Sequence, residues 1–501
     1  MKRPLLGLVL AFFTFPLCTM VMATAAEPQS SVQLPKTASD WAKLAHQDIE
    51  AAFQMTAENH PGVADPLNPH FRRQLLQART NALLLDVKDA YSYEAAIDRF
   101  SASLRDGHAG AFATLPDSIP TIRRWPGFIV AWRGDAFWVY YSEQPGVNAG
   151  MQLISCDGQS AEQLMKDRVF AYTGQPDQPG HWWSYSRRLL LDDGNPFNSQ
   201  ALQQCQLRQT NNEIKTVTLT WRPRPESVMP QVEAATNGDK LPVALSWPHA
   251  QVAWIAMPTF SPDPADIKNY EKLFTDLQQQ RPKLLEAKAI VLDLRHNQGG
   301  SSYWSTQVAF ELWGKQRVES LHQVLFSKTK VWWYASAGNT AYVVSLYDVM
   351  KAQGQTHYLP WIKSVGQGMQ QALKSGQPFY IDDSEADIAS TASTPQPPEL
   401  TTPVYVVMPG QCASACLDAI DTFRLFSNTK LIGATSSADS TYMEVRLQPL
   451  PSGLGQVIIP TKVYIDRPRA NGQYFEPDLA HHDLEWSSAS FLQKILADLK
   501  H

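Results

Sequence analysis

The spacing of apolar side chains predicts three helices over residues 38–108. Apolar residues recur there every three or four positions, as on the buried face of an amphipathic helix. The first predicted helix stops at ENHPG, because proline ends a helix at the preceding residue. The second covers residues 71–85. The third is capped near Ser92 and ends in LRDGHAG, where Gly107 suits a left-handed stop, so His108 lies just beyond a helix end.

Residues 121–225 change to short runs that are typical of strands. GFIVAW and AFWVYYS are rich in β-branched and aromatic residues. CQLRQ and KTVTLTW alternate with a period of two, and Asn211-Asn212 lies between them. QLISC precedes a tight Asp-Gly turn and the start of a helix. We therefore predict a small β-rich module in this part of the chain.

From residue 245 onward, buried strands alternate with amphipathic helices. VAWIAM, AIVLDL and VYVVM are predicted strands, DPADIKNYEKLFTDLQQQ is a predicted helix, and TKLIGAT and GQVIIPTKVYI add further strands. Alternation of this kind is typical of a largely parallel sheet covered by helices. The sequence thus predicts an α/β fold for the second half of the chain.

Two segments interrupt this alternation. Residues 315–381 are aromatic-rich and partly helical, and residues 384–400 form a Ser/Thr/Pro-rich loop that cannot pack a core. Long structureless loops are usually mobile or functional. We interpret residues 315–400 as a cap insertion beside the site, with a purely decorative insertion as the alternative.

Charge and the first residues narrow the class of protein. The net charge is −5 and no Lys/Arg-rich run occurs, which argues against a nucleic-acid partner. A basic start, an apolar run and small residues before residue 27 predict a cleaved signal peptide, residues 1–26, with a membrane anchor as the alternative. No later stretch is apolar enough to span a bilayer, so we expect no stable membrane insertion. We therefore expect the protein to be periplasmic or secreted.

Beyond Cys18 of the signal peptide, four cysteines remain. Four cysteines allow three pairings, and spacing favours Cys156 with Cys205 and Cys412 with Cys416. For Cys412 and Cys416, two buried free thiols are the alternative. His-Glu-x-x-His is absent and the pair at residues 481–482 lacks a spaced third ligand, so no metal site and no cofactor are expected.

Two loops carry candidate chemistry: RHNQGGS and PGQCASAC, each directly after a predicted strand. Ligands of open α/β sheets bind at such strand ends. Ser414 stands where a helix begins, so free N–H groups would stabilise nearby negative charge, while Gly299 and Gly300 allow close backbone approach. This is the minimum layout for acyl transfer. In the plainer interpretations, Ser414 only caps its helix, the Gly-Gly loop is only a turn, and His108 is a solvated loop residue. The Gly-x-Ser-x-Gly elbow of α/β-hydrolases is absent from the sequence.

Four segments in this order, AIVLDLRHNQGG, PVYVVMPGQCASAC, KLIGAT and GQYFEPD, resemble the C-terminal processing (tail-specific) serine peptidase family. ENHPG and LRDGHAG fit the same architecture, and PGVNAGMQLISCDGQS is similar to a stretch of PDZ domains. The resemblance covers nearly all residues after the signal peptide. It implies a crotonase-like protease core (226–501, with the cap 315–400), an N-terminal helical domain (27–120) and a PDZ-like module (121–225).

The resemblance implies roles for the residues of these motifs. Ser414 takes the position of the nucleophile, and the backbone N–H groups of Gly299 or Gly300 and of Ala415 take the oxyanion positions. One branch of the family places a lysine base shortly after the KLIG strand, but residues 434–446 contain no lysine. A Ser–Lys dyad would therefore need Lys430 or Lys462 to fold into reach.

The other branch is similar to the tricorn core protease and the interphotoreceptor retinoid-binding modules, and this chain resembles it more closely. It uses a histidine base from an Asp-Gly-His motif and a late glutamate, positions held here by His108 and Glu476. A neutral imidazole suits a serine hydroxyl, and a carboxylate would hold its tautomer. Gly107 replaces the serine that links these residues in the tricorn enzyme, so Asp106 and Asp478 are alternatives to Glu476.

We therefore expect an exported serine endopeptidase that cleaves polypeptides, of the tail-specific type, through an acyl-enzyme on Ser414. The disulfide beside Ser414 would keep its turn rigid. The alternative is a non-catalytic module of the same fold that binds a lipophilic ligand, with Trp332, Trp333 and Trp361 lining an apolar pocket. An esterase or amidase for small substrates would use the same residues. The sequence does not determine the oligomeric state.

Overall fold

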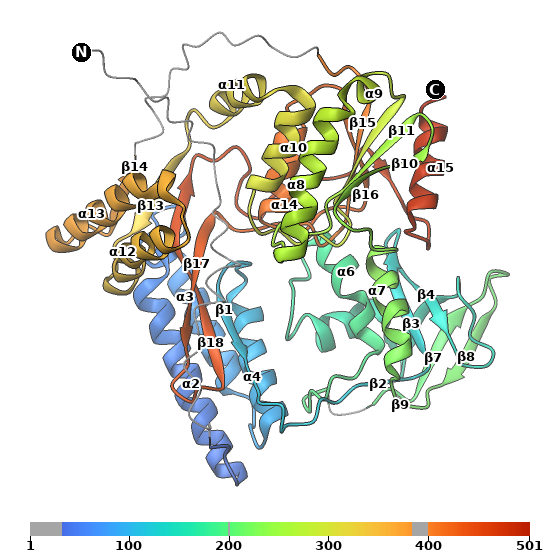
Figure 1. Ribbon diagram of the computed structural model, residues 1–501. Coiled ribbons are helices and arrows are strands. Elements are labelled where there is room, and N and C mark those ends of the chain that lie inside the picture. The colour runs from blue at the N-terminus through green and yellow to red at the C-terminus, as the bar shows by residue number, and fades with distance from the viewer. Residues whose placement is uncertain (1–32, 199–200, 383–398, 501) are drawn as a thin grey trace, which may run out of the picture.

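The computed structural model describes residues 33–198, 201–382 and 399–500. The predicted signal peptide, residues 1–26, and nearly all of the Ser/Thr/Pro-rich stretch 384–400 lie outside the described residues. Figure 1 shows N-terminal helices, a β-rich module and a mixed α/β core. No helix within the described ranges is long and apolar enough to cross a membrane.

The three predicted N-terminal helices are confirmed as α2 (Ala38–Asn59), α3 (Phe71–Leu83) and α4 (Ala90–Leu104). Their apolar faces pack together and against the hairpin of β17 (Tyr442–Pro449) and β18 (Gly455–Ile465). In Figure 1 the blue helices lie beside these orange-red strands. The two ends of the sequence therefore share one hydrophobic core.

Both ends of α4 differ from the prediction. The N-cap is Asp89, three residues before Ser92. The Asp89 side chain accepts the N–H of Ser92, and the Ser92 hydroxyl accepts the N–H of Asp89, which together form a capping box. At the other end Arg105, not Gly107, is left-handed, with φ 56°. The chain leaves the helix in an Asx turn, in which the Asp106 carboxylate accepts the His108 N–H at 2.8 Å. Gly107 therefore needs no positive φ.

The strands predicted between residues 121 and 225 form an antiparallel sheet, with β6 beside β5. Its strands are β3 (Phe128–Arg133), β4 (Ala136–Ser142), β5 (Gln152–Cys156), β6 (Gln159–Ser160), β7 (Gln204–Arg208) and β8 (Ile214–Thr218). Cys156 and Cys205 stand opposite each other on β5 and β7 and form the predicted disulfide.

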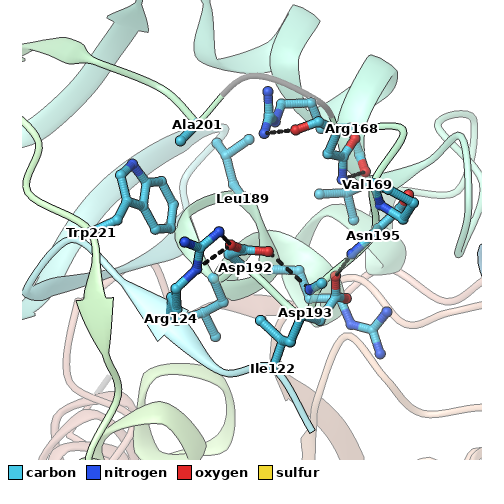
Figure 2. Close-up of a pocket in the computed structure, with 15 residues that line it drawn as sticks. Ile122, Arg124, Arg168, Val169, Leu189, Asp192, Asp193, Asn195, Ala201 and Trp221 are labelled. Atoms are coloured by element: carbon cyan, nitrogen blue, oxygen red, sulfur yellow. Dashed lines mark hydrogen bonds and ion pairs between the residues drawn. The ribbon is translucent and has the colours of Figure 1, made fainter. Parts of the chain in front are cut away.

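Short elements complete this β-rich module: β2 (Arg124–Trp125), β9 (Arg222–Pro223), α5 (Ala161–Leu164), α6 (Pro179–Tyr185) and α7 (Met229–Asn237). The module also contains a cavity of about 320 Å³, lined among others by Arg124, Leu189 and Trp221. In this cavity, which Figure 2 shows, Asp192 accepts hydrogen bonds from the guanidinium group of Arg124. Arg124 is therefore neutralised by a neighbour of its own module.

The α/β core contains a six-stranded sheet in the order β10-β11-β12-β15-β16-β19. Every neighbouring pair is parallel except β10 with β11, which confirms a mostly parallel sheet. The strands are β10 (Ala244–His249), β11 (Val252–Ala256), β12 (Ala289–Asp293), β15 (Val404–Met408), β16 (Thr429–Gly433) and β19 (Leu479–Ala480).

Helices cover both faces of this sheet. Ala253 and Ile255 pack on the side of α8 (Pro264–Gln279), α10 (Tyr303–Trp313) and α14 (Ala415–Phe423). The alternate residues Val252 and Trp254 pack on the side of α15 (Ser488–Asp498), together with Trp183 of α6. Because both faces are buried, the central strands β11 and β15 carry apolar or aromatic residues at every position, as the sequence pattern predicts.

A second sheet has the order β1-β18-β13-β14, in which β1 spans Gly110–Ala113, and β17 pairs with β18. GQVIIPTKVYI is a strand as predicted, but it lies here rather than in the parallel sheet, because the short 450–454 turn makes β17 and β18 an antiparallel hairpin. The segment predicted as a cap supplies α11 (Lys315–Leu325), β13 (Lys330–Tyr334), α12 (Ala337–Ala352), α13 (Leu359–Ser375) and β14 (Phe379–Asp382). Its β13 pairs directly with β18.

Replacing both Cys156 and Cys205 by alanine should destabilise the β-rich module by about 2–5 kcal/mol, because the bond closes a loop of 49 residues. Urea unfolding followed by near-ultraviolet circular dichroism measures the change. Cys412 and Cys416 provide the matched control, since they are only 4 residues apart and constrain the unfolded chain less. Equal midpoints for the Cys156/Cys205 double variant and the oxidised wild type would contradict the prediction.

Candidate active site

Three loops of the core meet at one edge of the parallel sheet. They are residues 294–302 after β12, 409–414 after β15 and 434–441 after β16. These strands are direct neighbours in parallel register, so their carboxyl ends lie side by side. The tertiary structure thus brings together the two loops that the sequence singles out and adds a third, residues 434–441, which we call the bridging loop.

Ser414 occupies the N-cap position of α14 without capping it. Its backbone has φ 54° and ψ −127°, a left-handed conformation that is unusual for serine, and its side chain accepts no helix N–H. Ser336 and Ser487, by contrast, cap α12 and α15 through their hydroxyl oxygens. The plain interpretation of Ser414 as a helix cap is therefore wrong. Its half-exposed hydroxyl remains available at a strained strand-to-helix turn.

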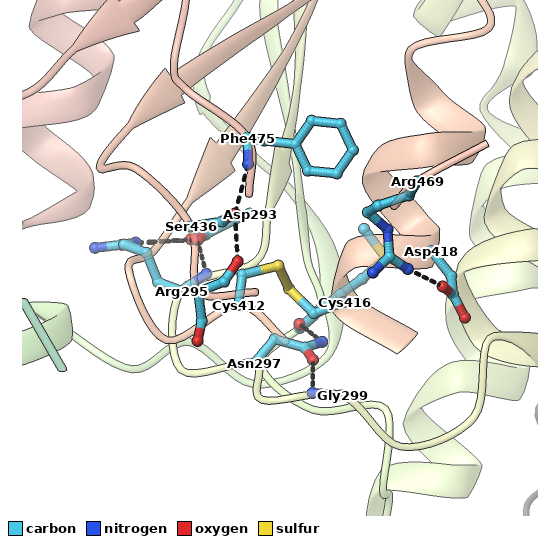
Figure 3. The surroundings of a disulfide bond; sticks show 12 residues. Asp293, Arg295, Asn297, Gly299, Cys412, Cys416, Asp418, Ser436, Arg469 and Phe475 are labelled. Atoms are coloured by element: carbon cyan, nitrogen blue, oxygen red, sulfur yellow. Dashed lines mark hydrogen bonds and ion pairs between the residues drawn. A yellow bond between two sulfur atoms is a disulfide. The ribbon is translucent and has the colours of Figure 1, made fainter. Parts of the chain in front are cut away.

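The predicted disulfide between Cys412 and Cys416 spans this turn. The two Cα atoms are 5.3 Å apart, and both residues are fully buried. In Figure 3 the disulfide lies with Asn297 and Gly299 on one side of it and Ser436 and Phe475 on the other. The bond ties the residue two before Ser414 to the residue two after it, which restricts the freedom of the turn.

The Gly-Gly loop lies directly against this turn. A Cβ added at Gly299, where φ is 106°, would lie 2.9 Å from Ser414 Cβ and 3.2 Å from the backbone nitrogen of Ala415. The N–H of Gly299 itself donates to Asn297 Oδ1 at 2.9 Å. Ala415 is the first residue of α14, so its N–H has no acceptor within the helix. Of the three predicted oxyanion donors, the Gly299 N–H is therefore already engaged, and the roles of Gly300 and Ala415 stay predictions.

A buried ion-pair cluster anchors the serine helix. Asp418, in the first turn of α14, accepts hydrogen bonds from Ser302, Arg467 and Arg469. Burial by itself would raise the pKa of Asp418, but the positive charges of Arg467 and Arg469 outweigh it and hold the pKa below its ordinary value. Arg469 also pairs with Asp421, and the cluster fixes α14 relative to the chain after β18.

The bridging loop contacts the segment that carries Glu476 and helix α6 of the β-rich module. The Ser436 N–H donates to the Phe475 carbonyl and the Phe475 N–H donates to Ser436 Oγ, both at 2.9 Å, which holds the segment that carries Glu476. A Cβ added at Gly180 of α6 would lie 2.4 Å from the Ser436 carbonyl and 2.3 Å from that of Gly410. The β-rich module therefore packs against two of the three loops.

His108 reaches the core through the same bridging loop. Asp106 Oδ1 accepts the His108 N–H at 2.8 Å and the Ser440 hydroxyl at 2.7 Å, which joins the turn after α4 to the loop after β16. The Nδ1 atom of His108 is buried and has no hydrogen-bond partner among the described residues. Over the same ranges no hydrogen bond joins His108 to Ser414, so their pairing stays a prediction.

The three carboxylates considered as supports for His108 have different surroundings. Glu476 is exposed, and it does not hydrogen-bond the buried Nδ1 of His108. Asp478 accepts the backbone N–H of Leu431 at 2.7 Å. Asp106 holds the main chain of His108. In this conformation none of them bonds the imidazole.

The lysines of a possible Ser–Lys dyad are engaged elsewhere. Lys430 donates to Asp498 at 2.8 Å, and the buried Lys462 lies 3.4 Å from a carboxylate oxygen of Glu444. Each therefore has its own carboxylate partner. No group of acidic, histidine or cysteine side chains in the described ranges has the geometry of a metal site.

Sequence reasoning did not identify His60 as part of this region. The residue is fully buried, and its Nε2 lies 3.1 Å from Asp106 Oδ2. Its only signal in the sequence is its place in ENHPG, which predicts a helix stop and no more. Because 46 residues separate it from Asp106, only the packing of α2 against α4 reveals the contact.

Replacing Gly299 by alanine should abolish activity with little effect on folding elsewhere. The new Cβ would lie 2.7 Å from the Ala413 carbonyl and against Ser414, in a backbone conformation that alanine rarely adopts. Gly107→Ala is the matched control, since no atom lies within 4 Å of its added Cβ. Peptidase assays of both variants, with thermal unfolding as a folding check, measure the difference. Full activity of Gly299→Ala would contradict the assignment of this loop.

Asp418→Asn should lower stability by about 3–5 kcal/mol at neutral pH, because it leaves the buried guanidinium group of Arg467 without its carboxylate partner and removes one of the carboxylates that pair with Arg469. A carboxylate with a lowered folded-state pKa stabilises the protein above its unfolded pKa of about 4 and loses this effect as the pH falls further. Urea unfolding should therefore show a weaker dependence on pH below about 4 in the variant. An unchanged pH dependence would show that Asp418 does not contribute.

Residues 251–480 match the model of peptidase family S41. No curated protein sequence matches the chain at a significant level. The structure is similar to that of mature CPAF, with a TM-score of 0.61, 12% sequence identity, and coverage of 91% of this chain and 98% of that one. It is also similar to mature CPAF complexed with lactacystin, with a TM-score of 0.58, 13% identity, and coverage of 91% and 99%. At such identities the likeness shows a shared fold alone. Residues 251–480, the segment that carries the serine turn and the Gly-Gly loop, therefore match a serine peptidase domain of the S41 family.

Proposed function

We propose that this peptidase is an exported endopeptidase that cleaves polypeptides near their C-termini through an acyl-enzyme on Ser414. The observation that carries the proposal is the uncapped, strained Ser414 against the Gly-Gly loop, in a chain of the S41 family. A crotonase-like core and a PDZ-like module, which the sequence resemblance implies, belong to the same proposal.

In the proposed mechanism, Ser414 Oγ attacks the scissile carbonyl carbon while its proton passes to Nε2 of His108. The N–H groups of Ala415 and Gly300 stabilise the oxyanion, since Gly299 donates to Asn297. The tetrahedral intermediate collapses as the amine leaves with the proton from His108. Water then attacks the acyl-enzyme while His108 again accepts a proton. The bond to Ser414 Oγ breaks as His108 returns this proton to it, which releases the carboxylate product and restores the serine.

Glu476 is the proposed third member of the triad. Its exposure and the unpartnered Nδ1 of His108 mean that this contact forms only if the 470–478 segment moves when substrate binds. Catalytic hydrogen bonds commonly tighten in the Michaelis complex, which supports keeping Glu476 in this role. The lysine-free bridging loop supports placing the chain with the histidine-using branch of the family.

Export is supported by the sequence of residues 1–26 and by the cysteines. The four cysteines of the described chain form two disulfides, which persist in oxidising compartments such as the periplasm or the extracellular space. The alternative of a lipophilic-ligand carrier lacks a comparable observation. Trp333, expected to line its pocket, is buried against Trp361.

Ser414→Ala should reduce hydrolysis of an unfolded protein substrate by at least about a thousandfold, because no nucleophile remains. A fluorophosphonate should label the wild type at Ser414, as peptide mapping by mass spectrometry would show. Ser487→Ala is the matched control: it removes a helix-capping serine, costs about 1 kcal/mol of stability and leaves hydrolysis intact. Hydrolysis by Ser414→Ala at the wild-type rate would exclude the acyl-enzyme.

A further inference from the structure

We propose that His60 and Asp106 are positioning residues that fix the main chain of His108 at the edge of the core. The inference rests on the proposed role of His108 as base. It concerns a group of side chains outside the serine turn that no motif of the sequence connects.

His60 has a defined tautomer. Its Nδ1 accepts the backbone N–H of Gly62 at 2.9 Å, so this nitrogen carries no proton. The proton of the neutral ring is therefore on Nε2, which donates to Asp106 Oδ2 at 3.1 Å. The ring is held in this orientation by stacking on Phe71, at 4.0 Å between centroids, and by the edge of Tyr442.

Asp106 receives hydrogen bonds on both carboxylate oxygens. Oδ2 accepts from His60, while Oδ1 accepts from the His108 N–H and from the Ser440 hydroxyl. Burial by itself would raise the pKa of Asp106, but its interactions with His60 foremost, and then with His108, hold the pKa below its ordinary value. The carboxylate therefore stays ionised and keeps all three donors.

The three bonds join three parts of the chain. His60 follows α2, His108 follows α4, and Ser440 belongs to the bridging loop, whose Ser436 holds the Glu476 segment. Gly62 allows this arrangement, since a Cβ there would lie 2.7 Å from the ring of Phe71. An error of 1 Å in the placement of a base can cost about 100-fold in rate. His60 thus acts on the reaction through Asp106, without touching substrate.

Two substitutions of His60 separate positioning from packing. Asparagine can replace Nδ1 as acceptor for Gly62 but cannot reach Asp106, whereas glutamine can place an N–H near Nε2 and donate to Asp106. Both lose the stacking on Phe71 equally. We expect His60→Asn to lower kcat on a peptide substrate about tenfold with KM within twofold of wild type, and His60→Gln to stay within threefold in both.

Asp106→Asn tests the charge. We expect kcat/KM to fall at least tenfold. In the plot of kcat/KM against pH we expect the acidic limb to move to lower pH, because removing a negative charge beside the base lowers the pKa of the base. His46→Asn, at an exposed position of α2, is the matched control and should behave as wild type. If a His60 variant does not fold, Ser440→Ala removes one donor without touching the aromatic packing and should lower kcat three- to tenfold.

The outcomes separate the two proposals. Equal losses in His60→Asn and His60→Gln would show that packing alone matters, and wild-type kcat in His60→Asn or an unmoved acidic limb in Asp106→Asn would overturn the positioning role. In either case His108→Gln and Ser414→Ala should still be inactive. Full activity of His108→Gln would instead overturn the proposed function itself.

Discussion

The parallel register of β12, β15 and β16 is the constraint on which the site depends. Parallel neighbours end at the same edge, so the Gly-Gly loop, the serine turn and the bridging loop meet there whatever their separation in sequence. Gly299 approaches Ser414 closely enough that a Cβ would not fit between them. Both faces of the sheet are covered by helices, so the strands cannot shift without unpacking the core.

The strained backbone at Ser414 needs support from its surroundings. A left-handed serine costs free energy and persists only where the neighbouring structure determines it. Here the disulfide restrains the turn on both sides of Ser414, and Asp418 holds the first turn of α14 to Arg467 and Arg469. The disulfide and the ion pairs of Asp418 therefore stabilise both the fold and the strained turn in which Ser414 does not cap its helix.

A second constraint comes from the closure of the chain on itself. The N-terminal helices share a core with the β17–β18 hairpin, and β1, directly after His108, pairs with β18. This long-range packing delivers His108 to the core, and Asp106 then fixes its main chain to Ser440. The proposed base, His108, and the proposed nucleophile, Ser414, thus come from opposite parts of the sequence, and different contacts hold each of them.

The sequence by itself determined most of the helices and strands and which two loops are the candidates for the chemistry. Apolar spacing located the N-terminal helices and the strands of the parallel sheet, since periodicity reports which face is buried. The spacing of the cysteines favoured both disulfides, and the motifs identified Ser414 and the Gly-Gly loop. Only the tertiary structure decided that GQVIIPTKVYI leaves the parallel sheet, that Arg105 ends α4, that Gly299 donates to Asn297, and that His60 contacts Asp106. Each of these depends on residues that are brought together by packing or by side-chain hydrogen bonds, and local pattern carries no information about such partners.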